Sequence, residues 1–284
     1  MPDGAGKRGY LHEDFRLFRL KDSRAQKLEN HYHEFDKVIL LLGGSVAYTV
    51  EGVTYFMRPW DILLVPRNQI HYARIDPAQP YERMVLWLGR EWLERRSGPE
   101  EPLSACFDLV RQRGFHLLRT DEARRPVYLR RLEEMEEALR SREFGSGQMA
   151  DICCQQFLID LGRDLLQDQT ARRERDSYRS DPKIEELLRY IAGHLPEDLS
   201  VDALAERTYL SRYYLMHRFK SATGYTVHQY VSQKRLLLAG ELLRQGVPVM
   251  KAAEQAGFRE YSSFLRAFRA KFHASPKDFR PGGK

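Results

Sequence analysis

The C-terminal third of the chain carries one pattern twice, 48 to 49 positions apart. Leu204-Ala-Glu-Arg207 precedes Ala252-Ala-Glu-Gln255 by 48 positions, and Phe219 precedes Phe268 by 49. Each copy predicts a short helix, a tight turn and a second helix with spaced apolar anchors, which is the geometry of a helix-turn-helix unit. The slip from 48 to 49 places one extra residue in the second turn, where Gly257 lies. A plain helical bundle is the alternative that topology alone leaves open.

Capping residues support the two-helix interpretation. Ser211 is a good N-cap for the second helix of the first copy, and Gly224 is a good C-terminal stop. A long helix from about Val227 to Arg244 is predicted to join the two copies.

The positive charge of the chain lies in the same third. Residues 182–284 hold 17 lysines and arginines against 10 aspartates and glutamates, while the other residues hold 29 against 30. This asymmetry predicts a polyanion-binding module attached to a neutral one. A solvated basic face without a partner is the alternative.

Residues 31–90 have a β pattern. The apolar run Val38-Ile-Leu-Leu-Leu ends at Gly43-Gly44, and Glu51-Gly52 separates two further strand-like segments as a hairpin turn would. Short strands divided by turn residues every 8 to 12 positions are typical of an antiparallel sandwich or barrel.

Helical periodicity follows the β region. Pro126 suits the first turn of a helix, and amphipathic helices are predicted over 126–142 and 148–168. Residues 168–181 are charged and nearly free of apolar side chains, which indicates an interdomain linker.

Cysteine content and hydropathy favour the cytoplasm. The chain has three cysteines, Cys106, Cys153 and Cys154, and none of them forms a CxxC spacing. This odd number argues against a disulfide framework and favours a reducing compartment. The N-terminal residues lack the apolar core of a signal peptide, and the longest charge-free apolar stretch, 38–50, is too short to span a membrane. We therefore expect a cytoplasmic protein with no membrane partner.

The C-terminal stretch resembles the DNA-binding domain of the AraC/XylS family of transcriptional regulators. The residues that carry this resemblance run from Leu199 to Arg280 and include Leu210-Ser-Arg-Tyr-Tyr-Leu-Met-His-Arg-Phe-Lys, Ala256-Gly-Phe and Phe264-Leu-Arg-Ala-Phe-Arg. His273 stands where the family usually has glycine, and Ala253 replaces a larger aliphatic residue. We expect neither departure to endanger the fold.

In a helix-turn-helix unit, the second helix lies in the major groove and its outward side chains reach base edges. Arg266 is the best single base reader, because a guanidinium matches guanine O6 and N7, and His217 is its counterpart in the first copy. The alternative for both Arg266 and His217 is contact with a phosphate group. For Lys220 and Arg269, phosphate contact is nearly as good an interpretation as base contact. The expected DNA contacts are Arg212, Tyr213, Met216, His217 and Lys220 in the first copy, and Arg259, Tyr261, Ser262, Ser263, Arg266 and Arg269 in the second.

The N-terminal half resembles a cupin sensor domain. His31-Tyr-His33 begins its β region, and Pro59-Trp60-Asp61 and His71 stand where the second cupin motif would fall. In metal cupins a glutamate four residues after the second histidine completes the site, but here that position is Lys37, whose cation would repel a metal. Trp60 in place of the usual glycine would narrow the same corner. We therefore predict no metal, no other cofactor and no catalytic residues.

The expected ligand pocket combines polar groups with aromatic walls. Its predicted residues are His31, His33, Lys37 and His71, with Trp60, Arg83 and Trp87 as walls. The alternative for each histidine is a surface or satisfied core position. A metal-dependent cupin enzyme, an isomerase or dioxygenase fused to the DNA-binding module, is the second reading of the whole chain.

The two resemblances together imply an α+β chain of two domains. An antiparallel cupin-like β-barrel is expected at 1–95, a helical dimerisation segment at 96–168, a linker at 169–181 and an all-α double helix-turn-helix domain at 182–284. They imply a sequence-specific, ligand-responsive regulator of transcription, and not an enzyme, that binds double-stranded DNA as a homodimer and controls carbohydrate metabolism genes. The expected effector is a sugar or sugar acid, and RNA polymerase is a further candidate partner. Helices that merely pack on the barrel are the alternative to a dimer surface.

Overall fold

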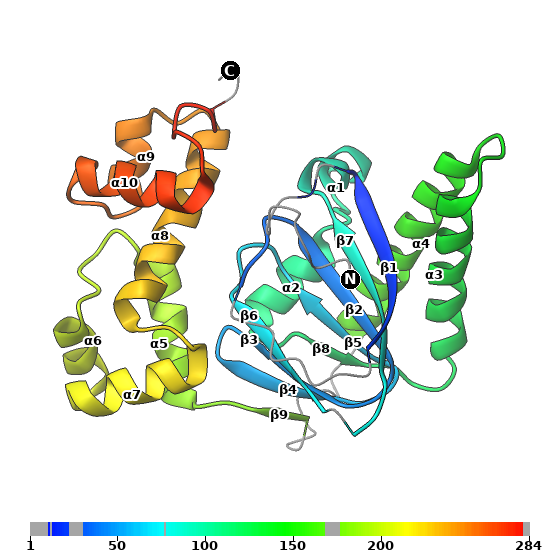
Figure 1. The fold of residues 1–284 in the computed structure, drawn as a ribbon, viewed down its shortest axis with the longest axis horizontal. Helices are drawn as coiled ribbons and strands as arrows, with labels where there is room; N and C mark the ends of the chain where they lie inside the picture. Colours follow the sequence, from blue (N-terminus) through cyan, green and yellow to red (C-terminus); the bar gives the residue numbers. More distant parts are fainter. Residues whose placement is uncertain (1–10, 12, 23–30, 77, 168–176, 281–284) are drawn as a thin grey trace. The chain divides into compact units, whose positions relative to one another are not determined.

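The computed structural model describes the chain except for residues 1–10, 12, 23–30, 77, 168–176 and 281–284. The chain divides into two compact units, Met1–Arg179 and Ser180–Lys284 (Figure 1). Within the described residues, none of the helices combines the length and the apolar character that crossing a membrane requires.

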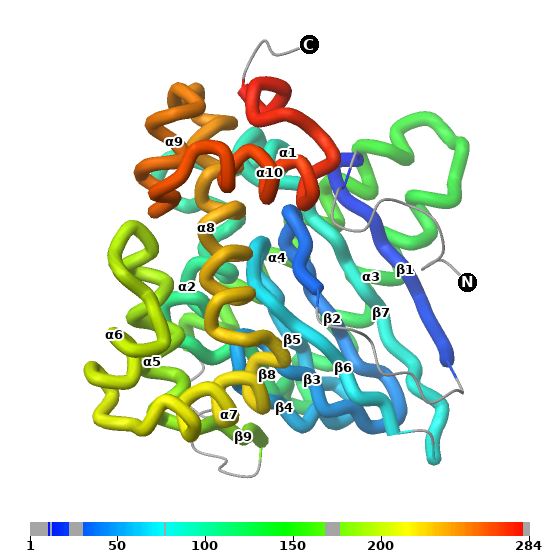
Figure 2. Tube along the Cα trace, turned by 60° about the vertical axis from the view of Figure 1, so that its left-hand side comes forward, coloured from blue at the N-terminus to red at the C-terminus, as the bar shows by residue number. Residues whose placement is uncertain are grey.

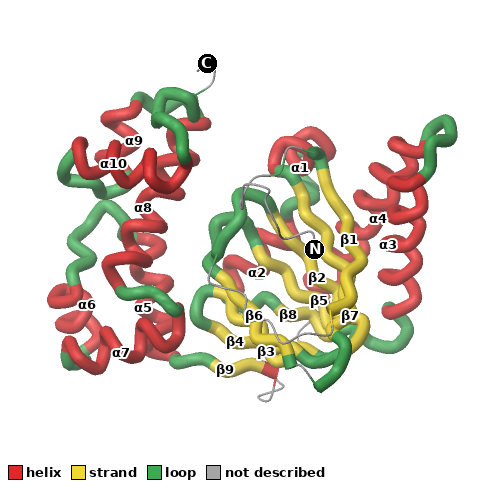
Figure 3. The backbone as a smooth tube through the Cα atoms, viewed as in Figure 1, coloured by secondary structure: helices red, strands yellow, loops and turns green. Residues whose placement is uncertain are grey.

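The first unit is built on two antiparallel sheets (Figure 3). The five-stranded sheet has the order β1-β7-β2-β5-β8, and the four-stranded sheet has the order β6-β3-β4-β9. The strands are β1 (Phe15–Asp22), β2 (Asp36–Gly43), β3 (Val46–Val50), β4 (Val53–Met57), β5 (Asp61–Val65), β6 (His71–Ile75), β7 (Tyr81–Leu88), β8 (Leu117–Arg119) and β9 (Tyr178–Arg179). The predicted antiparallel β domain is confirmed.

Residues 38–42 of strand β2 are all apolar because the strand is covered on both faces. Side chains alternate between the faces of a strand, so Ile39 and Leu41 join the core between the sheets, while Val38 and Leu40 join a second core on the outer face. The same alternation turns Lys37 toward the inner core side of the strand.

Among the described residues of the first unit, the helices are α1 (Arg90–Arg96), α2 (Ala105–Arg113), α3 (Arg125–Arg140) and α4 (Ser146–Gln167). Their apolar faces supply Phe107, Leu132 and Phe157 to the outer core, against Leu64 and Leu86 of the five-stranded sheet. Pro126 lies in the first turn of α3, as predicted.

The hairpin predicted at Glu51-Gly52 is confirmed. Both residues have positive φ, 45° and 79°, and they join β3 to β4 by a two-residue turn. Positive φ at both central positions is the geometry that matches the twist of paired strands, and glycine adopts it without steric cost.

The sheets draw on more of the chain than residues 1–95. Strand β1 forms an edge of the larger sheet, β8 comes from the segment predicted to be helical, and β9 comes from the predicted linker and pairs with β4. Most of the remaining linker, residues 168–176, lies outside the described residues.

The second unit is all-α, as predicted. Its helices are α5 (Pro182–Gly193), α6 (Val201–Thr208), α7 (Arg212–Thr223), α8 (Val227–Arg244), α9 (Val249–Gln255) and α10 (Tyr261–Phe272). Helices α6 and α7 form one helix-turn-helix unit and α9 and α10 form the other, and α8 runs between them (Figure 2). The long helix predicted to join the two copies is α8, and it has the predicted bounds.

Each helix-turn-helix unit packs its apolar anchors against the joining helix. Phe219 of α7 makes an edge contact with Tyr230 of α8, with ring centroids 5.4 Å apart. On α10, Phe268 and Phe272 pack on each other and on Phe279, and the rings of Phe272 and Phe279 lie against Gly240 of α8. Burial of these rings fixes which face of α7 and of α10 is turned outward.

Candidate functional site

The outward face of α7 presents five of the predicted DNA-contacting side chains. Leu215 and Phe219 are fully buried, while the side chains between them are exposed. The ring of Tyr213 stacks over that of His217 at 6.4 Å, and the Arg212 guanidinium pairs with Asp202 of α6 at 2.9 Å. The exposed set is Arg212, Tyr213, Met216, His217 and Lys220.

The outward face of α10, with Arg259 in the turn before it, presents the other predicted set. Phe264 and Phe268 are buried, and Arg266 and Arg269 lie exposed between and beyond them. Arg266 makes no hydrogen bond or ion pair with the part of the chain that the structure describes, so its guanidinium remains available to an external partner. The exposed set is Arg259, Tyr261, Ser262, Ser263, Arg266 and Arg269.

Local capping fixes where each recognition helix begins and ends. The Ser211 side chain accepts a hydrogen bond from the Tyr214 N–H, and Gly224 ends α7 with φ of 77°, both as predicted. His273 ends α10 in the left-handed conformation, with φ of 53°, so a histidine takes a turn position in which glycine is the usual residue.

Gly257 holds the second turn against the loop after α5. Its φ is +90°, and a Cβ atom there would lie 2.2 Å from the Leu195 carbonyl oxygen. Arg235 of α8 fixes the same loop, because its guanidinium donates to the carbonyl oxygens of Leu195 and Glu197 at 2.9 and 2.7 Å. The position therefore requires glycine both for backbone conformation and for space.

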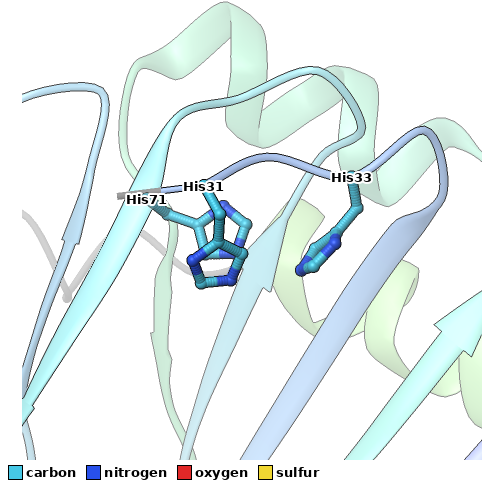
Figure 4. Close-up of side chains that lie close together, drawn as sticks. All are labelled: His31, His33 and His71. Atoms are coloured by element: carbon cyan, nitrogen blue, oxygen red, sulfur yellow. The ribbon is translucent and has the colours of Figure 1, made fainter. Parts of the chain in front are cut away.

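In the first unit, three predicted pocket histidines lie together (Figure 4). His31 and His33 precede β2, and His71 begins β6. One ring nitrogen from each of the three falls within 4.8 Å of the others. The ring centroids of His31 and His71 are 4.3 Å apart, and that of His33 is 4.9 Å from each. Below, these residues are called the histidine cluster.

Burial keeps two rings of the histidine cluster neutral. Desolvation is the largest cause that lowers the pKa of both His33 and His71 well below the usual value, and the charge of Lys37 lowers both further. His71 Nδ1 lies 2.9 Å from the Gln69 carbonyl oxygen, which can only accept, so Nδ1 carries the proton and Nε2 keeps a lone pair. Within the described residues, His71 Nε2 and both nitrogens of His33 are buried without a hydrogen-bond partner.

Lys37 and Trp87 lie beside this cluster. They are direct partners on β2 and β7, the Lys37 ammonium donates to the Tyr48 hydroxyl at 3.3 Å, and the Trp87 ring lies 6.0 Å from that of His33. Lys37 is buried, although lysine is seldom found inside a protein.

Two predicted pocket walls lie elsewhere. Trp60 packs against the outer core beneath the helices and not against the histidine cluster, because it occupies the turn before β5 with φ of 77°. It therefore does not narrow the space around the histidines. Arg83 faces the inner core side of β7, but it lies four residues, or about 13 Å, from Trp87 along the strand and pairs with Asp22 at 2.6 Å.

Sequence reasoning missed Phe35, Tyr48 and Tyr209. Phe35 stacks on His33 at 4.4 Å, and the Tyr48 ring lies 5.9 Å from that of His71. Strand alternation puts Tyr48 on the same face of β3 as Val50, but only the structure shows that Val50 pairs with His71 of β6. Tyr209 lies in the turn between α6 and α7 with 95% of its surface exposed, which makes it a further candidate DNA contact.

Comparison with known proteins matches each unit of the chain to a family model. The family model described as the AraC-like ligand binding domain matches residues 18–144, and the one described as a helix-turn-helix domain matches residues 204–282. The arabinose operon regulatory protein of Salmonella typhimurium is 28% identical over 252 residues, which cover 86% of this chain and 82% of that protein.

A shorter relative and a solved structure match the second unit. The regulatory protein SoxS of Escherichia coli is 34% identical over 98 residues, which are 34% of this chain and 92% of SoxS. The crystal structure of the DNA-binding domain of AdpA with a target DNA is 34% identical, covers 36% of this chain and 91% of that chain, and has a TM-score of 0.34. Both named relatives are regulators, which decides against the enzyme reading that the sequence left open. The chain belongs to the AraC/XylS family of transcriptional regulators, with an N-terminal ligand-binding domain and a C-terminal helix-turn-helix domain that binds DNA.

Proposed function

We propose that this regulator controls genes of carbohydrate metabolism in response to a sugar or sugar acid, and that it acts as a cytoplasmic homodimer. The observation that carries the regulatory part is the pair of exposed faces on α7 and α10, each fixed by buried aromatic anchors. The printed name of one relative, the arabinose operon regulatory protein, supports the sugar class.

The two recognition helices would read sequence through few side chains. Arg266 is the base reader of α10 and His217 that of α7, because both are exposed in the middle of the outward face. Lys220 and Arg269 contact phosphates, which fix the register of the protein on the duplex without reading bases.

The effector would bind beside the histidine cluster. Lys37 supplies a positive charge, the imidazoles supply donors and acceptors, and Trp87 supplies an apolar wall. An anionic or polyhydroxylated molecule matches this set, which is why we place a sugar acid before a neutral sugar.

The homodimer would form through α4. Ile152, Ile159 and Leu166 are exposed at seven-residue spacing along this helix, so they form one apolar stripe on the side away from the core. A seven-residue repeat is the spacing by which paired helices pack.

Effector binding would change the populations of dimer states that present the DNA-binding domains differently. RNA polymerase would be the further partner where the protein activates transcription.

The proposal is tested on the full chain in two steps. A binding site is first selected from random duplex DNA. The affinity of the protein for this site and the unfolding temperature of the protein are then measured with and without each member of a panel of sugars, sugar acids and amino acids. We expect one sugar or sugar acid to raise the unfolding temperature by mass action and to change DNA affinity. Stabilisation by an amino acid alone would contradict the carbohydrate assignment while leaving the regulator intact.

A further inference from the structure

We propose that His31, His33 and His71 bind a divalent transition metal ion, and that Lys37 weakens this binding so that the ion exchanges. The inference does not depend on the sugar effector or on DNA binding.

The first support is the state of the ring nitrogens. His71 offers Nε2 as a lone pair because its Nδ1–H is held by the Gln69 carbonyl, and His33 offers one nitrogen as a neutral ring. Such a hydrogen bond on the far nitrogen is how metal-binding histidines are commonly oriented. Buried polar atoms without partners are rare in folded proteins, so these nitrogens point to an occupant.

The second support is the spacing. The three nitrogens lie within 4.8 Å of one another, and a tetrahedral metal at about 2.1 Å from each would need separations of about 3.4 Å, so each pair would approach by up to about 1.4 Å. Small rotations of the side chains supply such a movement. Three imidazoles suit zinc, cobalt, nickel or copper, whereas magnesium and calcium prefer oxygen.

The third support concerns the rest of the coordination shell. The indole N–H of Trp87 is buried and has no acceptor within the described part of the chain. A water or anion that completes the coordination of the metal would be an acceptor beside it.

Lys37 sets the strength of the site. The buried Lys37 ammonium donates to the Tyr48 hydroxyl at 3.3 Å, and the Tyr48 ring lies 5.9 Å from that of His71. The positive charge beside the cluster also lowers the pKa of both His33 and His71. The charge of Lys37 repels a dication, so it costs affinity without removing any ligand. The prediction of no metal, made from Lys37, thus becomes one of weak and exchangeable metal.

The test titrates Co²⁺ into the chelator-treated full chain and follows visible absorption, with calorimetry of Zn²⁺ binding in parallel. We expect one ion per chain. His33→Phe keeps the stack on Phe35 but lacks the nitrogens, and His31→Gln leaves the backbone of the cluster unchanged. Each should weaken binding by more than about tenfold, since losing a ligand costs at least as much as losing its hydrogen-bond partner.

Two further variants complete the design. Lys37→Met should bind the ion about tenfold more tightly or better, a gain that misfolding cannot produce. His228→Ala, which removes an exposed histidine of α8, should bind like the wild type. Absence of saturable binding by both the wild type and Lys37→Met would overturn the proposal, as would equal binding by the wild type and His33→Phe.

Discussion

His31 and His71 exchange two backbone hydrogen bonds: His31 N–H donates to the His71 carbonyl at 3.1 Å, and His71 N–H donates to the His31 carbonyl at 2.9 Å. This bridge holds the chain before β2 against the start of β6, and it places the two rings 4.3 Å apart. The approach of the two imidazoles is therefore set by strand pairing and not by a free loop.

A matched pair of glycine substitutions tests the second helix-turn-helix turn. Gly257→Ala should lower the unfolding temperature strongly and weaken DNA binding, because the new Cβ would clash with the Leu195 carbonyl in a backbone conformation that alanine disfavours. Gly246→Ala is the control: its φ is +86°, yet nothing lies within 4 Å of the added Cβ. It should cost only about 1–2 kcal/mol of stability. Equal losses in thermal unfolding would contradict the packing argument.

His116 should make the first unit sensitive to acid. It is buried and bonds the Leu64 carbonyl through Nδ1, and desolvation lowers its pKa to about 4. Above pH 6.5 both folded and unfolded states carry the neutral ring. As the pH falls from 6.5 to about 4, the unfolded chain binds the proton first, so roughly 3 kcal/mol of stability is lost, with no further loss below.

The measurement for His116 is chemical unfolding across this pH range. His116→Asn keeps a donor for the Leu64 carbonyl and should show a shallower decline in stability from pH 6.5 to 4 than the wild type. The exposed His228→Asn should decline as the wild type does. A His116→Asn slope equal to that of the wild type would show that other groups cause the loss.

The proposed dimer surface can be tested at Ile159. Ile159→Lys places a charge in the middle of the exposed stripe of α4 and should shift the protein to monomer, because burying an unpaired ammonium opposes association. Ile159→Leu keeps the apolar side chain and should remain dimeric. Light scattering or sedimentation gives the mass. A dimer that survives Ile159→Lys would place the interface elsewhere.

Arg266 and Lys220 should affect DNA binding differently. Arg266→Ala should weaken binding to the selected site by about 1–3 kcal/mol and relax preference at one base position. Lys220→Ala should weaken binding to all sequences about equally and reduce the salt dependence. Fluorescence anisotropy over a panel of single-base variants distinguishes the two. Uniform weakening by Arg266→Ala would reassign it to a phosphate contact.

The sequence predicts some elements well for physical reasons. The run Val38 to Leu42 predicts a strand, and its doubly buried position explains why polar residues are absent from it. The bounds of α8 were predicted as those of the segment that joins the two copies of the repeat, and the structure adds that Thr226 caps this helix. In the candidate site, His31, His33 and His71 were expected together from the cupin resemblance.

Other features depend on contacts that a sequence pattern does not contain. Strand β1 lies at a sheet edge with polar residues on it, and β9 has two residues, so neither shows a strong periodicity. Trp60 was predicted to line the ligand pocket from its place in the sequence motif, but its turn, with positive φ, directs it to the outer core. That Lys37 would be buried beside two neutral histidines follows only from the pairing of β2 with β7.

The central claim is that this chain reads DNA sequence, and the most direct measurement compares its affinity for a selected site with that for the scrambled site. Both affinities are taken for the full chain by anisotropy at one salt concentration near physiological. Our account predicts that the selected site binds at least about a thousandfold more tightly, with both affinities falling steeply as salt rises. Equal affinity for the two duplexes would contradict the account and would make the protein a nonspecific DNA binder.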